Sequence, residues 1–292
     1  MNTPVEDTYC EAFDGLVARM LVTAADRKRL KRAALDATAL PCTVLGESEA
    51  GVERFVDAGE TPDGREGALI QVWVSKTKDA RKKLELELGR RIRQGILVVP
   101  STTLFNALDS GELIDMTYRV GNCGDGFETH VRYKGREMID VPIMMGSFKI
   151  ERAMGLKEGI MGGNLWFYCD SMENALKVLD KAEDAVRGVE GVVLTFREGC
   201  SAGSKAGGKY KHIGPSTNEL YCPTLKGCLE SKVPEGVGCI PELVLNGLSL
   251  EAVKNAMKKA VEAVDGMAGL KKIAAGNYGG KLGKHRIFLK GL

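Results

Sequence analysis

The chain has 292 residues, of which 44% are hydrophobic, and its 41 Lys and Arg against 39 Asp and Glu give a formal net charge of +2. Charge so close to balance argues against a dedicated nucleic-acid binder, because such a protein needs a cationic excess to displace the counterions of the phosphate backbone. No run approaches the ~18 apolar residues of a membrane-spanning helix, and the polar start Met1–Asp7 is unlike a secretory signal peptide. We therefore expect a soluble, cytoplasmic protein without a membrane or nucleic-acid partner.

Eight cysteines are spread along the chain, and none belongs to a C-x-x-C pair. A chain of this length can bury a stable hydrophobic core without disulfide bonds. We therefore expect free thiols in a reducing cytoplasm rather than a disulfide framework. The cysteines and histidines also lack the paired short spacing of zinc ligands, so no metal site is predicted.

A strand–helix–strand pattern occurs four times along the chain. In the third and fourth units the helical stretch carries apolar residues at three- and four-residue spacing, which places them on one face. Asp170 and Glu173 predict a capping box at the start of the third helix. In chain order the predicted elements are Arg19–Ala25, Arg27–Thr38 and Cys42–Leu45; Ala68–Val74, Lys78–Arg93 and Ile96–Val99; Leu165–Cys169, Ser171–Arg187 and Val192–Phe196; Glu242–Leu245, Leu250–Val264 and Lys271–Ala274.

Two successive units of this kind are typical of a ferredoxin-like arrangement, in which two helices back one face of a sheet. Between the second and third units, Met116–Val120, Phe127–Tyr133 and Met138–Ile143 read as short strands, with Lys134-Gly135 as a hairpin turn. The sequence thus predicts an α+β fold of two pseudo-symmetric ferredoxin-like α/β sandwich lobes, residues 1–145 and 146–292, with a short β insertion.

Three segments with several glycines follow the second strand of their units, namely Gly46–Gly51, Gly199–Gly208 and Gly276–Gly283. Glycine lets a ligand approach the main chain closely, and backbone N–H groups together with Ser, Asn and Lys side chains suit an anionic or heteroaromatic ligand. A single segment of this kind is often only a tight turn, but three at equivalent places predict a ligand cleft. None of them has the spacing of a phosphate loop or a dinucleotide fingerprint.

The same segments make the chain resemble the formylmethanofuran:tetrahydromethanopterin formyltransferase family. The most specific string is Ala275–Gly283, which reads AGNYGGKLG, and the resemblance extends in order from end to end of the chain. The other matching segments are Glu6–Thr8, Glu11–Phe13, Glu49–Glu53, Thr61–Arg65, Gly124–Phe127, Gly162–Asn164, Ser216–Asn218 and Cys222–Gly227.

The resemblance implies an enzyme of one-carbon metabolism that moves a formyl group from N-formylmethanofuran to N5 of tetrahydromethanopterin. It implies direct transfer without a metal or an acyl-enzyme. It also implies a homotetramer built as a dimer of dimers, with the two coenzymes as co-substrates and no tightly bound cofactor.

Formyl transfer between two nitrogens passes through a tetrahedral carbon that bears an oxyanion, so the site must stabilise that oxygen, for which a protonated carboxyl group can be the donor, and manage one proton. Glu242 opens the apolar run Pro241–Leu245, where burial would keep a carboxyl group protonated. The resemblance assigns this catalytic part to the glutamate of the matching strand. A solvated glutamate at a strand edge is the alternative, because glutamate is seldom buried.

Residues that bind the coenzymes are expected in the glycine-containing and neighbouring matching segments. Lysines suit the carboxylates of both coenzymes and the phosphate of the pterin, and hydroxyl or amide groups orient substrates by hydrogen bonds. The candidates are Ser201, Ser204, Lys205, Thr224, Lys226, Asn277, Tyr278, Gly279, Gly280 and Lys281.

One segment departs from the family pattern. Where the family usually has Phe-Pro-Gly-Gly, this chain has Phe196-Arg197-Glu198-Gly199, which we expect to change the backbone shape and the charge beside the cleft. This departure leaves open a non-catalytic or altered-substrate ferredoxin-like paralogue. A subunit of a bacterial formyltransferase/hydrolase complex is the other alternative.

Overall fold

A computed structural model describes residues 1–39, 48–205, 208–210, 212 and 216–292. The chain forms two compact units, one of Met1–Asp14 with Gly159–Leu292 and the other of Gly15–Glu158. Two long strands, β1 (Tyr9–Thr23) and β9 (Ala153–Cys169), contribute residues to both units. The lobe limits 1–145 and 146–292 stay a prediction. No helix of the described ranges is long and apolar enough to cross a membrane.

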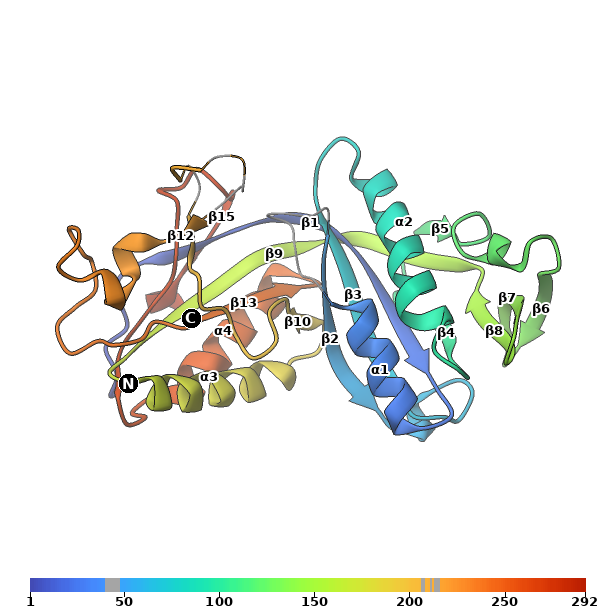
Figure 1. Cartoon of the computed structure of the whole chain (residues 1–292), viewed down its shortest axis with the longest axis horizontal. Helices are drawn as coiled ribbons and strands as arrows, with labels where there is room; N and C mark the ends of the chain where they lie inside the picture. The colour runs from blue at the N-terminus through green and yellow to red at the C-terminus, as the bar shows by residue number, and fades with distance from the viewer. Residues whose placement is uncertain (40–47, 206–207, 211, 213–215) are drawn as a thin grey trace. The chain divides into compact units, whose positions relative to one another are not determined.

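The Gly15–Glu158 unit has the β-α-β-β-α-β order of a ferredoxin-like fold. Its antiparallel strands lie in the order β2-β3-β1-β4, and α1 and α2 belong to the same unit (Figure 1). Besides β1, its elements are α1 (Arg27–Ala37), β2 (Glu49–Val56), β3 (Gly67–Ser75), α2 (Ala80–Arg91) and β4 (Thr103–Asn106).

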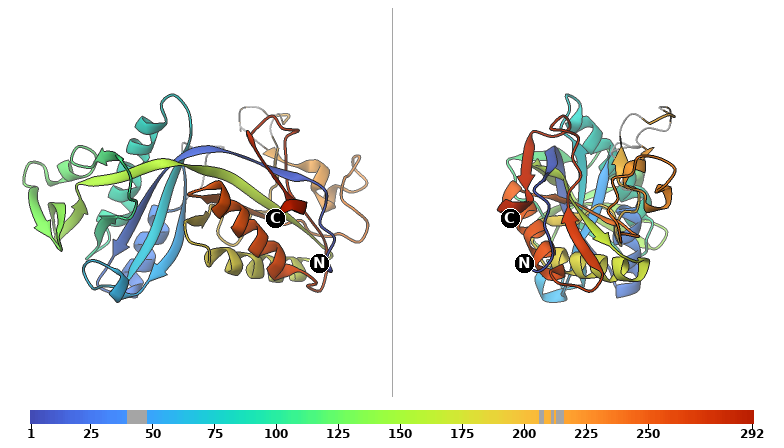
Figure 2. Two further views of the ribbon diagram at one scale, coloured as in Figure 1. Left: turned by 180° about the vertical axis from the view of Figure 1, so that it is seen from behind. Right: turned by 90° about the vertical axis from the view of Figure 1, so that its left-hand side faces the viewer.

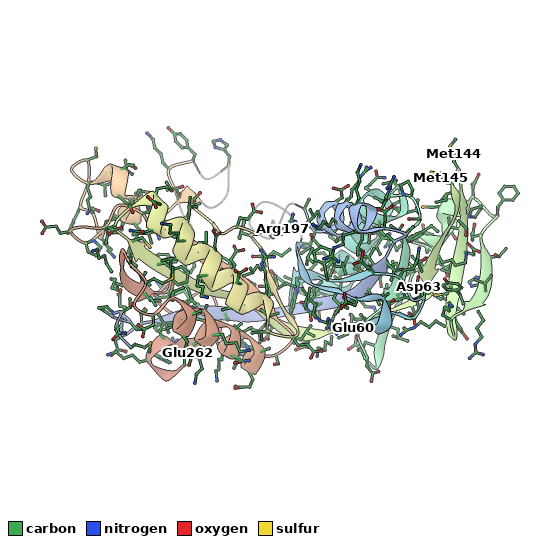
Figure 3. The ribbon with its side chains drawn as sticks, turned by 90° about the horizontal axis from the view of Figure 1, so that it is seen from below. Glu60, Asp63, Met144, Met145, Arg197 and Glu262 are labelled. Atoms are coloured by element: carbon green, nitrogen blue, oxygen red, sulfur yellow. The ribbon has the colours of Figure 1, made fainter. Side chains whose placement is uncertain are left out.

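The predicted β insertion is present and comprises β5 (Glu112–Asp115), β6 (Thr129–Tyr133), β7 (Arg136–Ile143) and β8 (Gly146–Glu151). The hairpin turn between β6 and β7 is confirmed, since Lys134 and Gly135 have φ values of 50° and 79°, as a type I′ turn requires. The side chains of Met144 and Met145 project from the turn between β7 and β8 (Figure 3).

The other unit repeats the same order of elements. Its antiparallel strands lie in the order β10-β13-β9-β14, which is the arrangement of the first unit, so the predicted pseudo-symmetry is confirmed. Two helices, α3 and α4, run side by side on one face of these strands (Figures 1 and 2). The elements are α3 (Met172–Arg187), β10 (Val192–Leu194), β13 (Glu242–Gly247), α4 (Leu250–Val264), β14 (Leu270–Ala274) and β15 (His285–Phe288), which pairs with β1.

Two predicted strands are wrong. Ile96–Val99 is not a strand, because the helical chain continues through the π-helical turn η2 (Ile92–Leu97). A Cβ on Gly95 of this turn would lie 2.6 Å from the backbone N of Ala37, so the turn packs directly against the end of α1. Met116–Val120 is a turn, since the carboxylate of Asp115 accepts the N–H of Thr117 at 2.8 Å and ends β5.

Three further predictions concern the segments Cys42–Leu45 and Gly46–Gly51 and the cap of α3. The predicted strand Cys42–Leu45 lies outside the described residues. The glycine-containing segment Gly46–Gly51 is not a loop as far as it is described, because Glu49–Gly51 begins β2. At the start of α3 the cap is Ser171, whose side chain accepts the N–H of Asn174, and the carboxylate of Asp170 instead accepts the side-chain amide of Asn174.

Candidate active site

Glu242 is the first residue of β13 and lies between two other segments of chain. On one side it pairs with Trp166 of β9. On the other side it forms a two-way bridge with Cys200, since the N–H of each residue donates to the carbonyl of the other at 2.8 Å. Residues opposite each other in an antiparallel bridge project their side chains to the same face. The carboxyl group, the indole and the thiol are therefore neighbours.

The carboxyl group of Glu242 is buried, with 8% of the residue exposed. Burial raises its pKa, and the Trp166 indole and the Cys200 thiol offset only part of that rise. The indole Nε1 is buried and forms no hydrogen bond of normal geometry. No cation among the described residues acts on this pKa. The surroundings therefore favour the protonated acid, which is a hydrogen-bond donor.

A pocket of about 430 Å³ opens beside these residues. Trp166 and Cys200, but not Glu242, form part of its wall, and α3 contributes Met172, Ala175, Leu176 and Leu179. The rest of the wall comes from Asn218 and from segments 198–203, 221–224 and 238–241. Most of these side chains are apolar and none of those described is a Lys or Arg, so the pocket suits an uncharged ring better than an anionic group.

The structure brings some of the predicted binding residues to this pocket and leaves others away from it. Ser201 and Thr224 line the pocket. Ser204 lies in the two-residue strand β11 (Ser204–Lys205), which pairs with β12 (Ser216–Thr217). Tyr278 is half-buried, and its pKa is raised by burial and then by Glu242 and Glu11, which places its hydroxyl in the surroundings of Glu242.

The three predicted lysines do not line the pocket. Lys205 forms an ion pair with Glu219. The ammonium of Lys226 donates to the carbonyls of Pro234, at 2.5 Å, and Val237, at 3.4 Å. Lys281 is exposed to solvent. A role of these cations in binding coenzyme carboxylates or phosphate stays a prediction.

The glycine-containing segment 276–283 is a loop, as predicted, but four of its N–H groups donate to another residue of the protein. These groups donate to the buried carboxylate of Glu11 in β1, namely those of Tyr278 at 2.7 Å, Gly280, Leu282 at 2.7 Å and Gly283 at 3.2 Å. The expectation that the backbone of this loop binds an anionic ligand is therefore wrong for these four groups, because the protein supplies the anion itself.

The side chains of Asn277 and Thr8 also form hydrogen bonds that hold this loop. The N–H of Gly279 donates to the side-chain oxygen of Asn277 at 3.2 Å, and the Asn277 amide donates to Thr8 Oγ1 at 3.1 Å and to the Tyr9 carbonyl at 3.2 Å. Contacts of Asn277, Gly279 or Gly280 with a substrate would thus have to use groups other than these.

The loop also touches the wall of the pocket at its first residue. Asn164 of β9 accepts the N–H of Gly276 at 2.7 Å and donates to its carbonyl at 3.2 Å. A Cβ on Gly276 would lie 2.7 Å from Cζ2 of Trp166, so glycine is required for the indole to pack against the backbone here. Trp166 is therefore in contact with both the pocket and the loop.

The segment that departs from the family pattern keeps a glycine-like backbone. Glu198 has a φ of +63°, a left-handed conformation that residues other than glycine adopt at a cost. The charge beside the pocket is changed, because Glu198 lines it, and the expected change of backbone shape stays a prediction.

No role in the site was predicted from the sequence for Glu11, Asn164, Trp166 or Cys200, although Glu11 and Asn164 lie in segments that match the family. Burial raises the pKa of the Cys200 thiol, which disfavours the reactive thiolate. Glu11 has the apolar neighbours Cys10 and Ala12, and a charged residue between apolar ones can indicate a buried partner. Within the described part of the chain, no group of three or more His, Cys, Asp or Glu residues is placed to hold a metal ion.

Comparison with known proteins gives matches along the whole chain. Residues 1–143 match a family model described as formylmethanofuran-tetrahydromethanopterin formyltransferase, and residues 146–292 match one described as the proximal lobe of the same family. A formylmethanofuran–tetrahydromethanopterin formyltransferase-like protein of Archaeoglobus fulgidus is 52% identical, over 100% of this chain and 97% of the relative.

Two solved structures are also similar. The formylmethanofuran:tetrahydromethanopterin formyltransferase of Methanosarcina barkeri is 37% identical, with a TM-score of 0.92 over 100% of this chain and 99% of that chain. A chain of the formyltransferase/hydrolase complex of Methylorubrum extorquens, solved with methylofuran, is 34% identical, with a TM-score of 0.90 over 98% of this chain and 96% of that chain. On these matches, the chain belongs to the formylmethanofuran–tetrahydromethanopterin formyltransferase family.

Proposed function

We propose that this chain is a formyltransferase that moves the formyl group of N-formylmethanofuran to N5 of tetrahydromethanopterin, with Glu242 as the hydrogen-bond donor to the oxyanion. One observation carries the assignment of Glu242. It is a buried carboxyl group with a raised pKa beside a pocket of about 430 Å³. The substrates follow from membership of the family.

The proposed reaction needs one donor and one proton movement. N5 of the pterin attacks the formyl carbon, and the electron pair of the C=O bond moves to oxygen. The protonated carboxyl of Glu242 stabilises this oxyanion by a hydrogen bond. Collapse of the intermediate breaks the bond from carbon to the methanofuran nitrogen, which gains the proton that N5 loses.

Ser201 and Thr224 are proposed to contact a substrate in the pocket, since both lie on its wall. Ser204, Lys205, Lys226, Asn277, Tyr278, Gly279, Gly280 and Lys281 remain candidates for binding the two coenzymes. We further expect no tightly bound cofactor, a homotetramer built as a dimer of dimers and a cytoplasmic location. Light scattering of the purified protein tests the oligomer.

The function is tested by mixing the purified chain with N-formylmethanofuran and tetrahydromethanopterin and following the N5-formyl product by absorbance. We expect turnover by the wild type and a loss of about a hundredfold or more in kcat for Glu242→Gln, the scale for one oxyanion donor. Glu183→Gln is the matched control. Glu183 of α3 is also buried, with a pKa raised by burial, but it is paired with Arg187, whereas Glu242 lies beside Trp166 and Cys200 of the pocket wall.

Each outcome of this assay has a separate meaning. Turnover that Glu242→Gln leaves unchanged would keep the function and exclude Glu242 as the donor. An equal loss in Glu183→Gln would show that a buried carboxyl is needed for the fold rather than for the chemistry. Failure of the folded wild type to turn over would contradict the proposed substrates.

A related enzyme with an altered substrate is the second candidate, and Glu198 favours it. This carboxylate lines the pocket at the segment where the family usually has glycine. It would repel an anionic substrate group that the usual sequence tolerates. An inactive wild type that gains turnover as Glu198→Gly would support this candidate. Turnover only with added hydrolase subunits would instead support a role like that of the chain from Methylorubrum extorquens.

A further inference from the structure

We propose that Glu11 is a positioning residue that acts as the template of loop 276–283 and so sets the place of Tyr278 and Asn277 before any substrate binds. This inference rests on the proposed function, since it assigns Glu11 to the site of formyl transfer. Glu11 touches no proposed reacting group and acts only through the loop.

The hydrogen bonds around Glu11 carry the argument. Its two carboxylate oxygens accept four backbone N–H groups within the six residues from Tyr278 to Gly283. The loop has no strand or helix pairing of its own, so these donors would otherwise be left without a protein partner. Hydrogen bonds to an ionised acceptor are about twice as strong as neutral ones. One carboxylate thus fixes most of the loop backbone.

Turns and close packing restrict the backbone conformation of the loop. Gly279 and Gly280 both have positive φ values, 68° and 79°, and the N–H groups on either side of this turn, those of Tyr278, Gly280 and Leu282, reach one anion. At the end of the loop, a Cβ on Gly283 would lie 2.3 Å from the carbonyl oxygen of Ala12. The loop therefore rests directly on the backbone of β1, the strand that carries Glu11.

The electrostatics agree with this role. Burial alone would raise the pKa of Glu11, but the four N–H hydrogen bonds lower it below its ordinary value. The loop therefore stabilises the ionised form of Glu11. At neutral and mildly acidic pH the Glu11 carboxylate stays ionised and keeps its hydrogen bonds to the loop. No ligand is needed to supply the negative charge.

The test compares Glu11→Gln, Glu11→Asp and Asp14→Asn with the wild type. Glutamine keeps the shape of the side chain but brings an N–H₂ group against N–H donors. Asp14 lies on the same strand and binds His285 and Lys284 beyond the loop, at 2.7 Å and 2.5 Å, so its substitution controls for a general loosening of the pairing between β1 and β15.

Two readouts are expected to change in Glu11→Gln. Amide hydrogen exchange of residues 278–283 should accelerate by about tenfold or more, without a matching change in the helices. If only a fraction of the molecules holds the binding-competent loop, the apparent substrate affinity falls by that fraction. We therefore expect KM to rise about tenfold with kcat changed far less, and Glu11→Asp, which keeps the charge, to recover part of both effects.

The outcomes separate this inference from the proposed function. Loop exchange and KM that stay at wild-type values in Glu11→Gln would overturn the role of Glu11, even if the wild type is fully active. A fall in kcat with unchanged KM would also overturn it, since that is the result of partial unfolding. A KM change of the same size in Asp14→Asn would do so as well. An inactive wild type would contradict the proposed function, while the exchange experiment would still decide whether Glu11 shapes the loop.

Discussion

Glu11 and Glu242 are both buried glutamates, yet their pKa values move in opposite directions. Burial raises the pKa in each case, but four backbone N–H groups outweigh it at Glu11, whereas an indole and a thiol do not outweigh it at Glu242. Glu242 can be found from the sequence because it opens an apolar run. The partners of Glu11 cannot, because they lie 267 to 272 residues further along the chain.

The thiol of Cys200 gives a prediction for the pH dependence of the reaction. This thiol lowers the pKa of Glu242, so Cys200→Ala is expected to raise it further. Because the reaction uses the protonated acid, activity is present below this pKa and is lost as the pH rises through it. The high-pH limb of the kcat profile should therefore move to higher pH in Cys200→Ala.

The control for this shift is Cys222→Ala, which changes a second thiol in the wall of the same pocket. Cys222 is not among the groups that act on the pKa of Glu242. An unmoved limb in Cys200→Ala, or an equal movement in Cys222→Ala, would contradict the assignment of this limb to Glu242.

At the level of elements, helices with a sustained period were predicted best. The limits of α4 agree with the prediction at both ends, because its apolar residues repeat over four turns and a serine precedes the first of them. Ile96–Val99 was assigned wrongly, since four apolar residues fit a strand and a helix end equally well. What decided this case was the close contact of Gly95 with α1, and a contact between distant residues is not visible in a local pattern.

The cap of α4 allows a test at this scale. The side chain of Ser249 accepts the N–H of Ala252 at 3.1 Å, and loss of such a cap costs about 1 kcal/mol. Ser249→Ala is expected to lower the free energy of unfolding by about this amount in urea titrations. Ser249→Gly should lower it by only a few tenths of a kcal/mol. Equal losses in the two variants would show that the cap is not what stabilises this helix end.

At the level of the whole molecule, the repeated order of elements was the most informative part of the sequence. Two β-α-β-β-α-β series predict two similar units, and the strand orders β2-β3-β1-β4 and β10-β13-β9-β14 agree with this. The sharing of β1 and β9 by both units was not predicted. The apolar run in the sequence indicated only part of each strand. The rest of the strand, such as Tyr9–Asp14, mixes apolar with polar and charged residues and was therefore not predicted.

The charge of the whole molecule predicts its response to salt. Acidic and basic residues nearly balance, at 39 against 41, so there is no large net repulsion for added ions to screen. Many of the ion pairs among the described residues join two exposed side chains, as between Lys177 and Glu173, and such pairs contribute little to stability. We expect activity and the thermal midpoint to change little between about 0.1 M and about 1 M KCl, over which the Debye length falls from about 10 Å to about 3 Å. An activity that appears only near molar salt would mean that charge balance does not govern the stability of this protein.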